Sequence, residues 1–593
     1  MKKIILSLSV ALCPLSLLAQ PAQLPDKPST VVIDSGRSTD SFAFRSNEEA
    51  GATCKIVDGA VYDVDVAKST KTQYSVELAI PTQVKVSKGD VAIARLCLRT
   101  LSAHQETAEC AVYFYFQMRQ SPYNKSIITQ LACGPEWTTY DIPFVVSDDM
   151  EAGTAVAAFG LGSLAQHVQI RDLVVLDYAK EVKLSDLPDT KFTYKGREEG
   201  AAWREEAMER IKELRTAPIS VSVVDAKGRP VRGAEVSVHM TRSAFLWGTA
   251  VDGSKLIADT PESETYREKL KELFNEACLG NGYKHGGWSW PDARKVNSLR
   301  ASQWLYDNGF RQRGHNLVWP GWKFNTAAMR EAAKLLDKEA FSEFVKASFY
   351  ERMAFAKGKV EAWDVVNEPM HEKEMFERLP EDVMVEWFQL AKKLDPDSQL
   401  FINDYAMLNG SQSPANIAEY ISLIKDLVAK GAPIEGIGVQ GHIGTLPRSP
   451  MQVISDLDMF KDLGIPVQIT EFDINTKDEE LQADYMRDFL IAVYSHPVIE
   501  GVQMWGFWQA DHWKPDAALY RRDWSEKPCA KAWKDLVCGE WKTSFTVATD
   551  RKGVVGSRGH FGKYTLDVTY KGKTVAKEFE LGPDGYDVQI VLE

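Results

Sequence analysis

Two glutamates, Glu368 and Glu471, each stand at the end of a largely apolar run, about a hundred residues apart in the sequence. Glu368 follows Trp363-Asp-Val-Val-Asn367, and Glu471 follows Val467-Gln-Ile-Thr470. If folding brings their carboxyl groups about 5 Å apart around a sugar ring, one can attack the anomeric carbon while the other protonates the leaving oxygen. This is retaining glycoside hydrolysis, and it needs neither a metal nor a cofactor.

The neighbours of the two glutamates suggest different roles for them. Asp473 follows Glu471 by two residues, and His442 is expected on the adjacent strand, so a Glu–His–Asp hydrogen-bond chain can keep Glu471 ionised as the nucleophile. Glu368 is followed by Pro369 and has no cation in its own motif. An acid whose pKa is raised there by desolvation stays protonated and can serve as the general acid.

Other polar and aromatic residues recur at the ends of apolar runs. These residues are Asn281, His315, Trp319, Asn367, Tyr405, Gln440, His442, Trp505 and Trp508. Any one of them could be an ordinary surface loop residue. Their repeated position after apolar strands is instead typical of an active site that is assembled from several strand ends.

The elements that must position these residues form a regular series. Apolar strand candidates alternate with helical stretches, at residues 245–251, 276–281, 310–319, 362–368, 399–405, 436–443, 466–474 and 502–509. Eight such alternations predict a (β/α)₈ TIM barrel over residues 201–541, with the chemistry at the carboxyl ends of the strands. The ends of strands 4 and 7 face each other across the mouth of such a barrel, so Glu368 and Glu471 are expected to converge.

The flanking regions have the short alternating runs of β-structure. Residues 30–180 predict an all-β jelly-roll sandwich, in which the run Tyr113-Phe-Tyr-Phe116 is a strand with alternate rings in the core. A polar linker is expected at 181–200. A hairpin at 218–240 and the tail at 542–593 are expected to form a small accessory β layer beside the barrel. The fold class is therefore multidomain.

Composition and charge limit the classes of function. Hydrophobic residues make up 44% of the 593 residues and charged residues 26%, which is typical of a folded protein. The net charge of −13 disfavours a nucleic-acid partner and suits a neutral substrate. Seven cysteines besides Cys13 are too few and too scattered for a disulfide framework, although a bridge between Cys529 and Cys538 stays open.

The first residues predict the compartment. Lys2 and Lys3 precede an apolar stretch at 4–18 and a plausible cleavage site at 17–20, so residues 1–19 are interpreted as an export signal. The protein is expected to be secreted, periplasmic or at the cell surface. Elsewhere no segment is apolar for long enough to span a bilayer.

Five motifs together carry a family resemblance. They are Gly314-His-Asn-Leu-Val-Trp319, Trp363-Asp-Val-Val-Asn-Glu-Pro369, Asn403-Asp-Tyr405, Gly438-Val-Gln-Gly-His442 and Ile469-Thr-Glu-Phe-Asp473. In this order they resemble the signatures of family 10 glycoside hydrolases, the endo-β-1,4-xylanases, and the resemblance runs from about Trp203 to Trp541. It implies that Glu368 is the acid/base, that Glu471 is the nucleophile, and that xylan or a related plant cell-wall polysaccharide is the substrate.

The resemblance also implies roles for the surrounding residues. Asn367 would hydrogen-bond the 2-hydroxyl of the sugar at the cleavage point, and Gln440 would help His442 and Asp473 to support Glu471. The other implied substrate contacts are Asn281, Lys284, His315, Trp319, Tyr405, Trp505 and Trp513. The front sandwich is similar in layout to carbohydrate-binding modules, although Trp137 is the one tryptophan that precedes Trp203.

Two departures from the family pattern put the choice of sugar in question. The family's Glu-Asn-x-x-Lys reads Gly280-Asn-Gly-Tyr-Lys284 here, and Pro320 replaces a histidine after Trp319. Loss of a carboxylate at position 280 widens the upstream subsite and leaves a β-1,4- or mixed-linkage glucan open as the substrate. A non-catalytic polysaccharide-binding protein is the alternative from another functional class.

Overall fold

The computed structural model describes residues 22–36, 43–105, 107, 109–288, 292–410 and 412–592. The chain divides into two compact units. The first runs to Lys191 except for the segment 105–109, which belongs with Phe192 and all that follows in the second unit. The boundary thus falls inside the predicted linker at 181–200. The predicted export signal at 1–19 lies outside the described residues.

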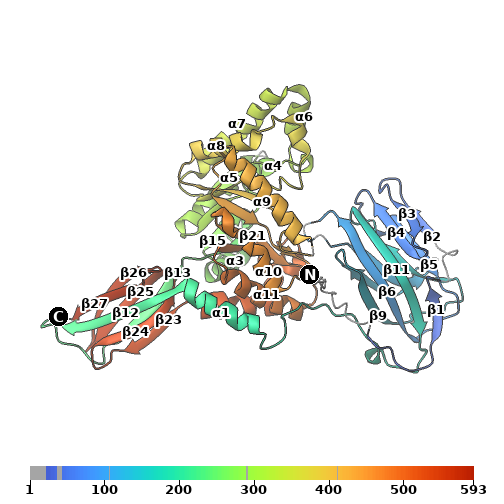
Figure 1. Ribbon diagram of the computed structural model, residues 1–593, viewed down its shortest axis with the longest axis horizontal. Helices are drawn as coiled ribbons and strands as arrows, with labels where there is room; N and C mark the ends of the chain where they lie inside the picture. The colour runs from blue at the N-terminus through green and yellow to red at the C-terminus, as the bar shows by residue number, and fades with distance from the viewer. Residues whose placement is uncertain are drawn as a thin grey trace, which may run out of the picture. The chain divides into compact units, whose positions relative to one another are not determined.

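The first unit contains two antiparallel sheets, which confirms the predicted all-β N-terminal region (Figure 1). One sheet has the order β3-β4-β11-β6-β9, with β1 also paired to β11. The other has the order β2-β5-β10-β7-β8. Their bounds are β1 Thr30–Asp34, β2 Ala43–Ser46, β3 Thr53–Val57, β4 Val61–Val66, β5 Val76–Pro81, β6 Val91–Ala103, β7 Val112–Met118, β8 Lys125–Leu131, β9 Thr138–Val145, β10 Ala155–Gly160 and β11 Gln166–Asp177.

The aromatic run of β7 differs from its prediction in one respect. Phe114 and Phe116 are buried, as expected for alternate positions of a strand, and the Phe116 ring lies 5.0 Å from that of Phe144. Tyr115, which alternates with them, is also fully buried. Its hydroxyl donates to Glu77, and its ring meets that of Tyr74 edge-on at 5.7 Å. Tyr115 points to the other face of the strand from Phe114 and Phe116, and Glu77 accepts the hydrogen bond of its buried hydroxyl.

The second unit holds a closed barrel of eight parallel strands, which confirms the predicted fold. The strands are β14 Leu246–Val251, β15 Glu276–Leu279, β16 Arg311–Gly314, β17 Ala362–Asn367, β18 Gln399–Asp404, β19 Gly436–Val439 with β20 His442–Ile443, β21 Val467–Ile474 and β22 Ile499–Met504. Pairings of β14 with β22 and of β19 with β21 close the ring.

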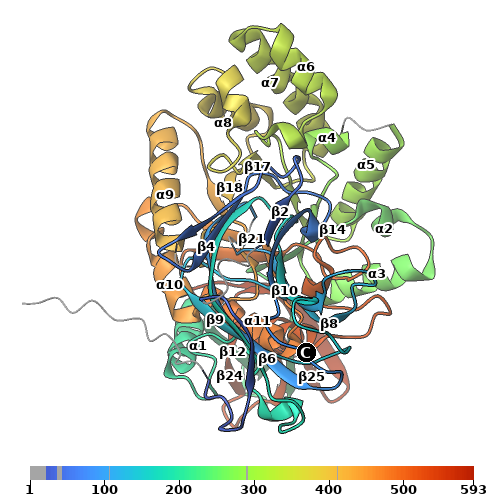
Figure 2. The same ribbon diagram turned by 90° about the vertical axis from the view of Figure 1, so that its right-hand side faces the viewer.

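Helices follow the strands and cover the outside of the barrel, with α5 and α9 on opposite sides of it in Figure 2. They are α1 Ala202–Arg215, α2 Gly253–Ile257, α3 Pro261–Leu273, α4 His285–Trp288, α5 Asp292–Asp307, α6 Ala327–Leu335, α7 Lys338–Ala356, α8 Val383–Leu394, α9 Ser413–Ala429, α10 Pro450–Asp458, α11 Glu479–Tyr494 and α12 Pro528–Trp533. Buried apolar side chains of strands and helices form one continuous core between the two layers.

Several barrel strands are shorter than predicted. Strand 3 is Arg311–Gly314 where 310–319 was expected, so His315 and Trp319 follow it, and strands 6 and 8 also differ. Strand 6 is interrupted after Val439 because Gly441 has φ +82°, and a Cβ there would lie 2.7 Å from Ile469 Cγ2. Strand 8 starts at Ile499 and ends at Met504. The apolar pattern continues beyond it, but Gly506 at φ +123° turns the chain away. Trp505 and Trp508 therefore lie after the strand.

The predicted hairpin at 218–240 is wrong. Its two strands, β12 Thr216–Asp225 and β13 Glu235–Ser243, lie in different sheets, with orders β24-β12-β27 and β23-β13-β25-β26. Both strands turn their apolar positions toward one shared core, so the connection passes from sheet to sheet. The accessory layer is therefore a two-sheet sandwich (Figure 1), completed by β23 Ser544–Ala548, β24 Val554–His560, β25 Gly562–Tyr570, β26 Lys573–Leu581 and β27 Tyr586–Leu592.

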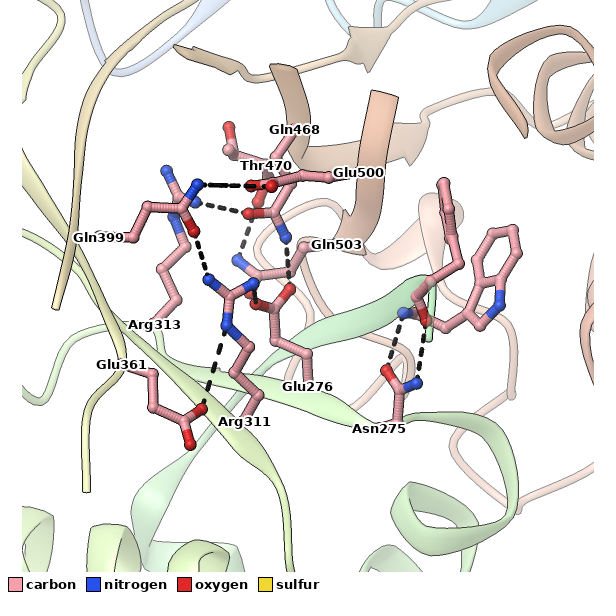
Figure 3. A network of polar contacts seen from close by, with 12 residues as sticks. Asn275, Glu276, Arg311, Arg313, Glu361, Gln399, Gln468, Thr470, Glu500 and Gln503 are labelled. Carbon is pink, nitrogen blue, oxygen red and sulfur yellow. Dashed lines mark hydrogen bonds and ion pairs between the residues drawn. The ribbon is translucent and has the colours of Figure 1, made fainter. Parts of the chain in front are cut away.

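A network of charged side chains fills the barrel near the beginnings of its strands (Figure 3). Arg311, the first residue of β16, contacts Glu276 at 3.4 Å and donates to Gln399 at 2.5 Å. Deeper in the barrel, Arg313 Nη1 donates to Gln468 Oε1 at 2.7 Å. The Arg313 guanidinium also forms a two-contact ion pair with the Asp364 carboxylate. The buried carboxylates at this end therefore have arginine partners.

Two further observations concern the cysteines and the question of a membrane-spanning helix. Cys529 and Cys538 are both free thiols, so the bridge that the sequence leaves open between them is absent. Among the residues that the structure describes, no helix combines the length and the apolar character needed to cross a bilayer.

Candidate active site

Glu368 occupies a tight turn at the carboxyl end of β17. Its backbone N–H donates to Asn403 O at 2.7 Å, and its own carbonyl accepts from the Glu372 N–H at 2.8 Å. The residue has φ +60°, in the left-handed region that non-glycine residues rarely adopt. Such a conformation costs about 1–3 kcal/mol and occurs preferentially at functional sites.

The Glu368 carboxyl group has two neutral hydrogen-bond donors. Trp319 Nε1 donates to Oε2 at 2.8 Å, and Gln440 Nε2 donates to Oε1 at 2.8 Å. Glu368 is 6% exposed. Burial and the nearby negative charge of Glu471 raise the pKa of Glu368 to about 8, although the two hydrogen bonds oppose this shift. The group is therefore largely protonated at neutral pH and can donate a proton.

Glu471 lies inside β21 in a different environment. Asn403 Nδ2 donates to Oε1 at 2.9 Å, and His442 Nε2 lies 3.4 Å from Oε2. The backbone N–H of Glu471 donates to Gln440 O at 2.7 Å, which fixes the strand beside the interruption between β19 and β20. The carboxylate thus has an amide donor on one oxygen and an imidazole on the other.

Glu471, His442 and Asp473 come together in the predicted order, but as ion pairs: among the described residues His442 Nδ1 forms no hydrogen bond of acceptable geometry. His442 Nδ1 lies 3.1 Å from Asp473 Oδ1, and Trp513 Nε1 donates to Asp473 Oδ2 at 2.7 Å. Burial lowers the pKa of His442, but the two carboxylates outweigh it and raise the pKa to about 10. His442 is therefore an imidazolium at neutral pH, and its positive charge lies beside the Glu471 carboxyl group.

The structure places the Gln440 side chain differently from the prediction. Gln440 is expected to support Glu471, but its amide contacts Glu368. Gln440 contacts Glu471 through its backbone carbonyl alone. The reason is that Gln440 follows β19 and precedes Gly441, where the chain turns and aims the side chain toward the end of β17.

Asn403 is a site residue that the sequence reasoning missed. Its Nδ2 donates to Glu471 and, at 2.7 Å, to Asn367 Oδ1, while Thr470 Oγ1 donates to its Oδ1 at 2.6 Å. The signal was available, since Asn403 is the first residue of the motif Asn403-Asp-Tyr405 and stands near the carboxyl end of β18. Asn367 Nδ2 finds no acceptor among the described residues, which leaves a buried donor beside both carboxyl groups.

His315 lies where β16 meets the barrel mouth. Its Nδ1 is 2.8 Å from Asp364 Oδ2, the carboxylate that Arg313 also holds. Its ring meets the Trp505 ring edge-on at 4.9 Å. The contacts of Arg313 with Asp364 inside the barrel therefore continue to His315, which the sequence predicts to contact the substrate.

Lys284, Trp319 and Trp505 form a second group at the same side of the mouth. Lys284 Nζ lies 5.0 Å from the centre of the Trp319 ring and 5.9 Å from that of Trp505. It also donates to Oδ1 of the exposed Asn281 at 3.2 Å. Burial lowers the pKa of Lys284, and the charges of Glu471 and Glu368 oppose this shift. The ammonium group therefore faces the carboxyl pair.

Three aromatic residues named by the sequence have different settings. Trp513 is 42% exposed and remains available to a ligand, whereas Tyr405 is 7% exposed and stacks on His371. Trp508 is 3% exposed and stacks on Trp524 at 4.6 Å, so it belongs to the packing around the site. His371 is a second residue that the sequence reasoning did not single out.

At the altered family position, the backbone of Gly280 can accept a side chain. A Cβ built there would meet Ala250 Cβ at 3.8 Å, an ordinary van der Waals distance, and no closer atom. The glycine is therefore not required by local packing. Its effect on the site is the absence of a carboxylate one residue before Asn281.

A closed barrel with two carboxyl groups at its mouth is the arrangement that (β/α)₈ glycoside hydrolases use. The chain belongs to glycosyl hydrolase family 10, whose sequence profile matches residues 237–536. This match confirms the family resemblance of the ordered motifs.

Individual relatives cover part of the chain. It is 30% identical over 380 residues to the anti-sigma-I factor RsgI6 of Acetivibrio thermocellus, which covers 63% of this chain and 48% of that protein. It is 30% identical over 366 residues to endo-1,4-beta-xylanase 1 of Arabidopsis thaliana, which covers 61% and 37%. The chain thus spans about half or less of the length of these relatives. Xylanase 10B from Thermotoga petrophila, solved with xylobiose, aligns with a TM-score of 0.45 and 23% identity over 50% of this chain and 94% of that one.

Proposed function

We propose that the protein is a retaining endo-β-1,4-xylanase that cleaves internal bonds of xylan by double displacement. The observation that carries the proposal is the unequal environment of the two carboxyl groups. Glu368 is bound by neutral donors and its pKa is raised to about 8, whereas Glu471 contacts the His442 imidazolium. One group is suited to donate a proton and the other to attack.

In the first step Glu471 attacks the anomeric carbon. The bond from that carbon to the leaving oxygen breaks, and Glu368 transfers its proton to this oxygen, which departs as the hydroxyl of the shortened chain. The product is a glycosyl ester on Glu471. Asn367 Nδ2, buried and without a protein acceptor among the described residues, is suited to bind the 2-hydroxyl of that sugar.

In the second step Glu368 acts as a base. It takes a proton from water, whose oxygen attacks the anomeric carbon and displaces Glu471 as a carboxylate. Two inversions give net retention, which predicts a carboxyl separation of about 5 to 5.5 Å. Departure of the first product brings water beside Glu368, so the same residue serves both steps.

Digestion of defined glycans tests the proposal. The purified protein is incubated with linear xylan, mixed-linkage β-glucan, carboxymethylcellulose and xylooligosaccharides, and products are sized by chromatography while ¹H NMR follows the first anomer released. Xylooligosaccharides of mixed length in the β-configuration are expected from xylan. Release of the α-anomer first would contradict retention, and faster cleavage of β-glucan would assign the alternative substrate.

A polysaccharide-binding protein without activity is the competing function. One relative is an anti-sigma-I factor, a name that states no hydrolytic activity, and this makes the loss of activity worth testing. In that case xylan retards the protein in affinity electrophoresis, yet no product forms from any of the glycans. The same gels, run with the Glu471→Ala variant, separate binding from turnover.

We propose further that the N-terminal sandwich binds the same polysaccharide. Tyr74 and Tyr123 are 43% and 52% exposed, and aromatic faces complement sugar rings. Trp137 is less suited because the guanidinium carbons of Arg99 and Arg171 lie 4.6 and 4.1 Å from the centre of its ring. Replacing both tyrosines by alanine in the Glu471→Ala chain is expected to reduce retardation by xylan. Unchanged retardation would exclude this surface.

We also propose that the protein is exported, because residues 1–19 have the pattern of a signal. Expression of the full sequence in a bacterial host, with fractionation and N-terminal sequencing, tests this. A processed chain outside the cytoplasm is expected. An unprocessed chain in the cytoplasm would contradict the proposal.

A further inference from the structure

His371 lies three residues after Glu368 and is tied to the turn that carries it. The His371 N–H donates to Glu368 O at 3.2 Å. Its ring is held by Asp404, because His371 Nδ1 lies 2.6 Å from Asp404 Oδ1. Asp404 is itself buried and accepts from the Met370 and Tyr405 backbone N–H groups, each at 2.9 Å. The imidazole therefore has a fixed position and orientation beside the proton donor.

The imidazole covers a residue that the sequence assigns to substrate binding. The rings of His371 and Tyr405 are stacked, with centres 3.8 Å apart and planes 16° apart. Tyr405 is 7% exposed, whereas 25% of the His371 side chain is exposed. The group that this part of the mouth presents to a ligand is therefore His371, with Tyr405 packed behind it.

The order of the strands places His371 and the group of Lys284 on opposite sides of the two carboxyl groups. Glu368 on β17 and Glu471 on β21 divide the ring of strands into two arcs. One arc holds β22, β14, β15 and β16, and it carries the group of Lys284, His315 and Trp505. The other holds β18, β19 and β20, and His371 leans onto this arc through Asp404 and Tyr405. In the proposed mechanism Glu368 protonates the leaving oxygen, and His371 lies on the same turn as Glu368. The arc of His371 is therefore the one we assign to the leaving-group side of the cleaved bond.

We propose that His371 is a substrate-binding and specificity-determining residue for the sugar on the leaving-group side of the cleaved bond. The imidazole face offers a flat surface to the sugar ring. Because Asp404 holds Nδ1–H, Nε2 is the nitrogen available to a sugar hydroxyl. This inference rests on the proposed xylanase activity.

Paired substrates separate this role from a general effect on catalysis. Xylopentaose places sugars on both sides of the cleaved bond, whereas β-xylobiosyl fluoride has a one-atom leaving group that cannot contact His371. For His371→Ala we expect kcat/KM on xylopentaose to fall at least about tenfold, with the positions of cleavage redistributed, because stacking and a hydrogen bond are both lost. On the fluoride, kcat/KM is expected to stay within about twofold of wild type.

Two further variants control the experiment. His371→Phe keeps an aromatic face and removes Nε2, so its loss on xylopentaose is expected to be smaller than that of His371→Ala. Lys373→Ala alters the same loop at a side chain that is 58% exposed and lies 3.8 Å from Glu419, and both substrates are expected to react as with wild type.

Each outcome bears on a separate claim. An equal loss on both substrates would overturn the proposal, because His371 would then act only through the turn of Glu368. An unchanged rate on xylopentaose would overturn it as well. If the wild-type protein cleaves neither substrate, the proposed xylanase activity fails instead, and the two failures are thereby distinguished.

Discussion

The two ends of the barrel both bury carboxylates, but they compensate them differently. Near the strand beginnings, Arg311 contacts Glu276 directly (Figure 3). Further along the strands, Arg313 contacts Asp364 in the same way. At the mouth, the carboxyl group of Glu368 contacts an indole and an amide. The difference shows how one fold separates stability from reactivity: charges that serve structure form ion pairs, whereas the group that must exchange a proton is hydrogen-bonded by neutral donors.

The electrostatics of the two ends agree with this division. Burial alone would raise the pKa of Asp364, but Arg313 and His315 outweigh it and hold that pKa below its usual range. Glu368 has no such partner, and its pKa rises to about 8. Glu471 differs from both in its contacts, which are one amide donor and one imidazolium. Substitutions at the mouth should therefore change mainly turnover, whereas substitutions of the arginine pairs should change mainly the free energy of unfolding.

The largest effect is expected from Glu471→Ala. Loss of the nucleophile should lower kcat by about 10⁶-fold, as removal of a nucleophile does in other covalent mechanisms. The thermal unfolding midpoint should change little because the residue lines the mouth. Azide is expected to restore turnover of an activated xyloside by this variant and to give an α-glycosyl azide. Normal xylan hydrolysis by the variant would refute the mechanism.

Glu368→Gln is expected to have the next largest effect on turnover. General acid catalysis contributes about 10²- to 10⁴-fold, and the amide cannot supply it. Because the raised pKa keeps Glu368 protonated up to about pH 8, wild-type kcat/KM should hold below that pH and fall above it. The Glu368→Gln variant should not show this fall in kcat/KM above about pH 8. A wild-type decline centred near pH 4 to 5, the ordinary range of a glutamate, would contradict the assignment.

Arg313→Met tests the opposite end of the barrel. It leaves Asp364 buried without its main cation, which should cost about 3–5 kcal/mol of unfolding free energy. Urea unfolding followed by tryptophan fluorescence measures this loss, because all but one of the tryptophans lie from Trp203 onward. Replacing both partners, as Arg313→Met with Asp364→Leu, should recover part of it. Equal instability of the single and double variants would argue against the ion pair as the cause.

The smallest effect concerns Gly280→Glu, which adds a charge to the mouth. A carboxylate that accepts from sugar hydroxyls contributes roughly 1.5–3 kcal/mol. The site has room for it, since the nearest atom to the new Cβ is 3.8 Å away. We expect kcat/KM on xylotriose and xylotetraose to rise about tenfold or more. Gly280→Ala is the matched control, and no gain for the glutamate over the alanine would show that other residues already fill this role.

The sequence was sufficient for features that depend on local pattern. The strand periodicity predicted the barrel, and the position of Glu368 and Glu471 after apolar runs predicted where they lie. The spacing of Glu471 and Asp473 predicted that both carboxyl groups would lie beside His442, and the structure pairs both with its imidazole. In these cases the residue order along one strand determines which side chains share a face.

Features that depend on distant pairing were not predictable in the same way. The partner of Gln440 depends on a chain turn at Gly441, and both sides of that turn look like one strand in sequence. The apolar alternation of β12 and β13 suits a hairpin as well as two facing sheets. Asn403 was hidden by attention to the last residue of its motif, although it contacts Glu471 directly.

The split sandwich of the second unit has a consequence for the folding of the chain. Ile219 of β12 pairs with Tyr586 of β27, and Val236 of β13 pairs with Val547 of β23, so the whole barrel lies between paired strands. During synthesis β12 and β13 are made long before their partner strands β27 and β23, so their apolar faces stay unpaired until the barrel has been synthesised. The paired residues are far apart in the sequence, so bringing them together costs loop-closure entropy. This cost is lower once the barrel between them has folded, because the ends of the intervening chain then lie closer together. Folding of the barrel therefore brings together the early and late strands of the accessory sandwich.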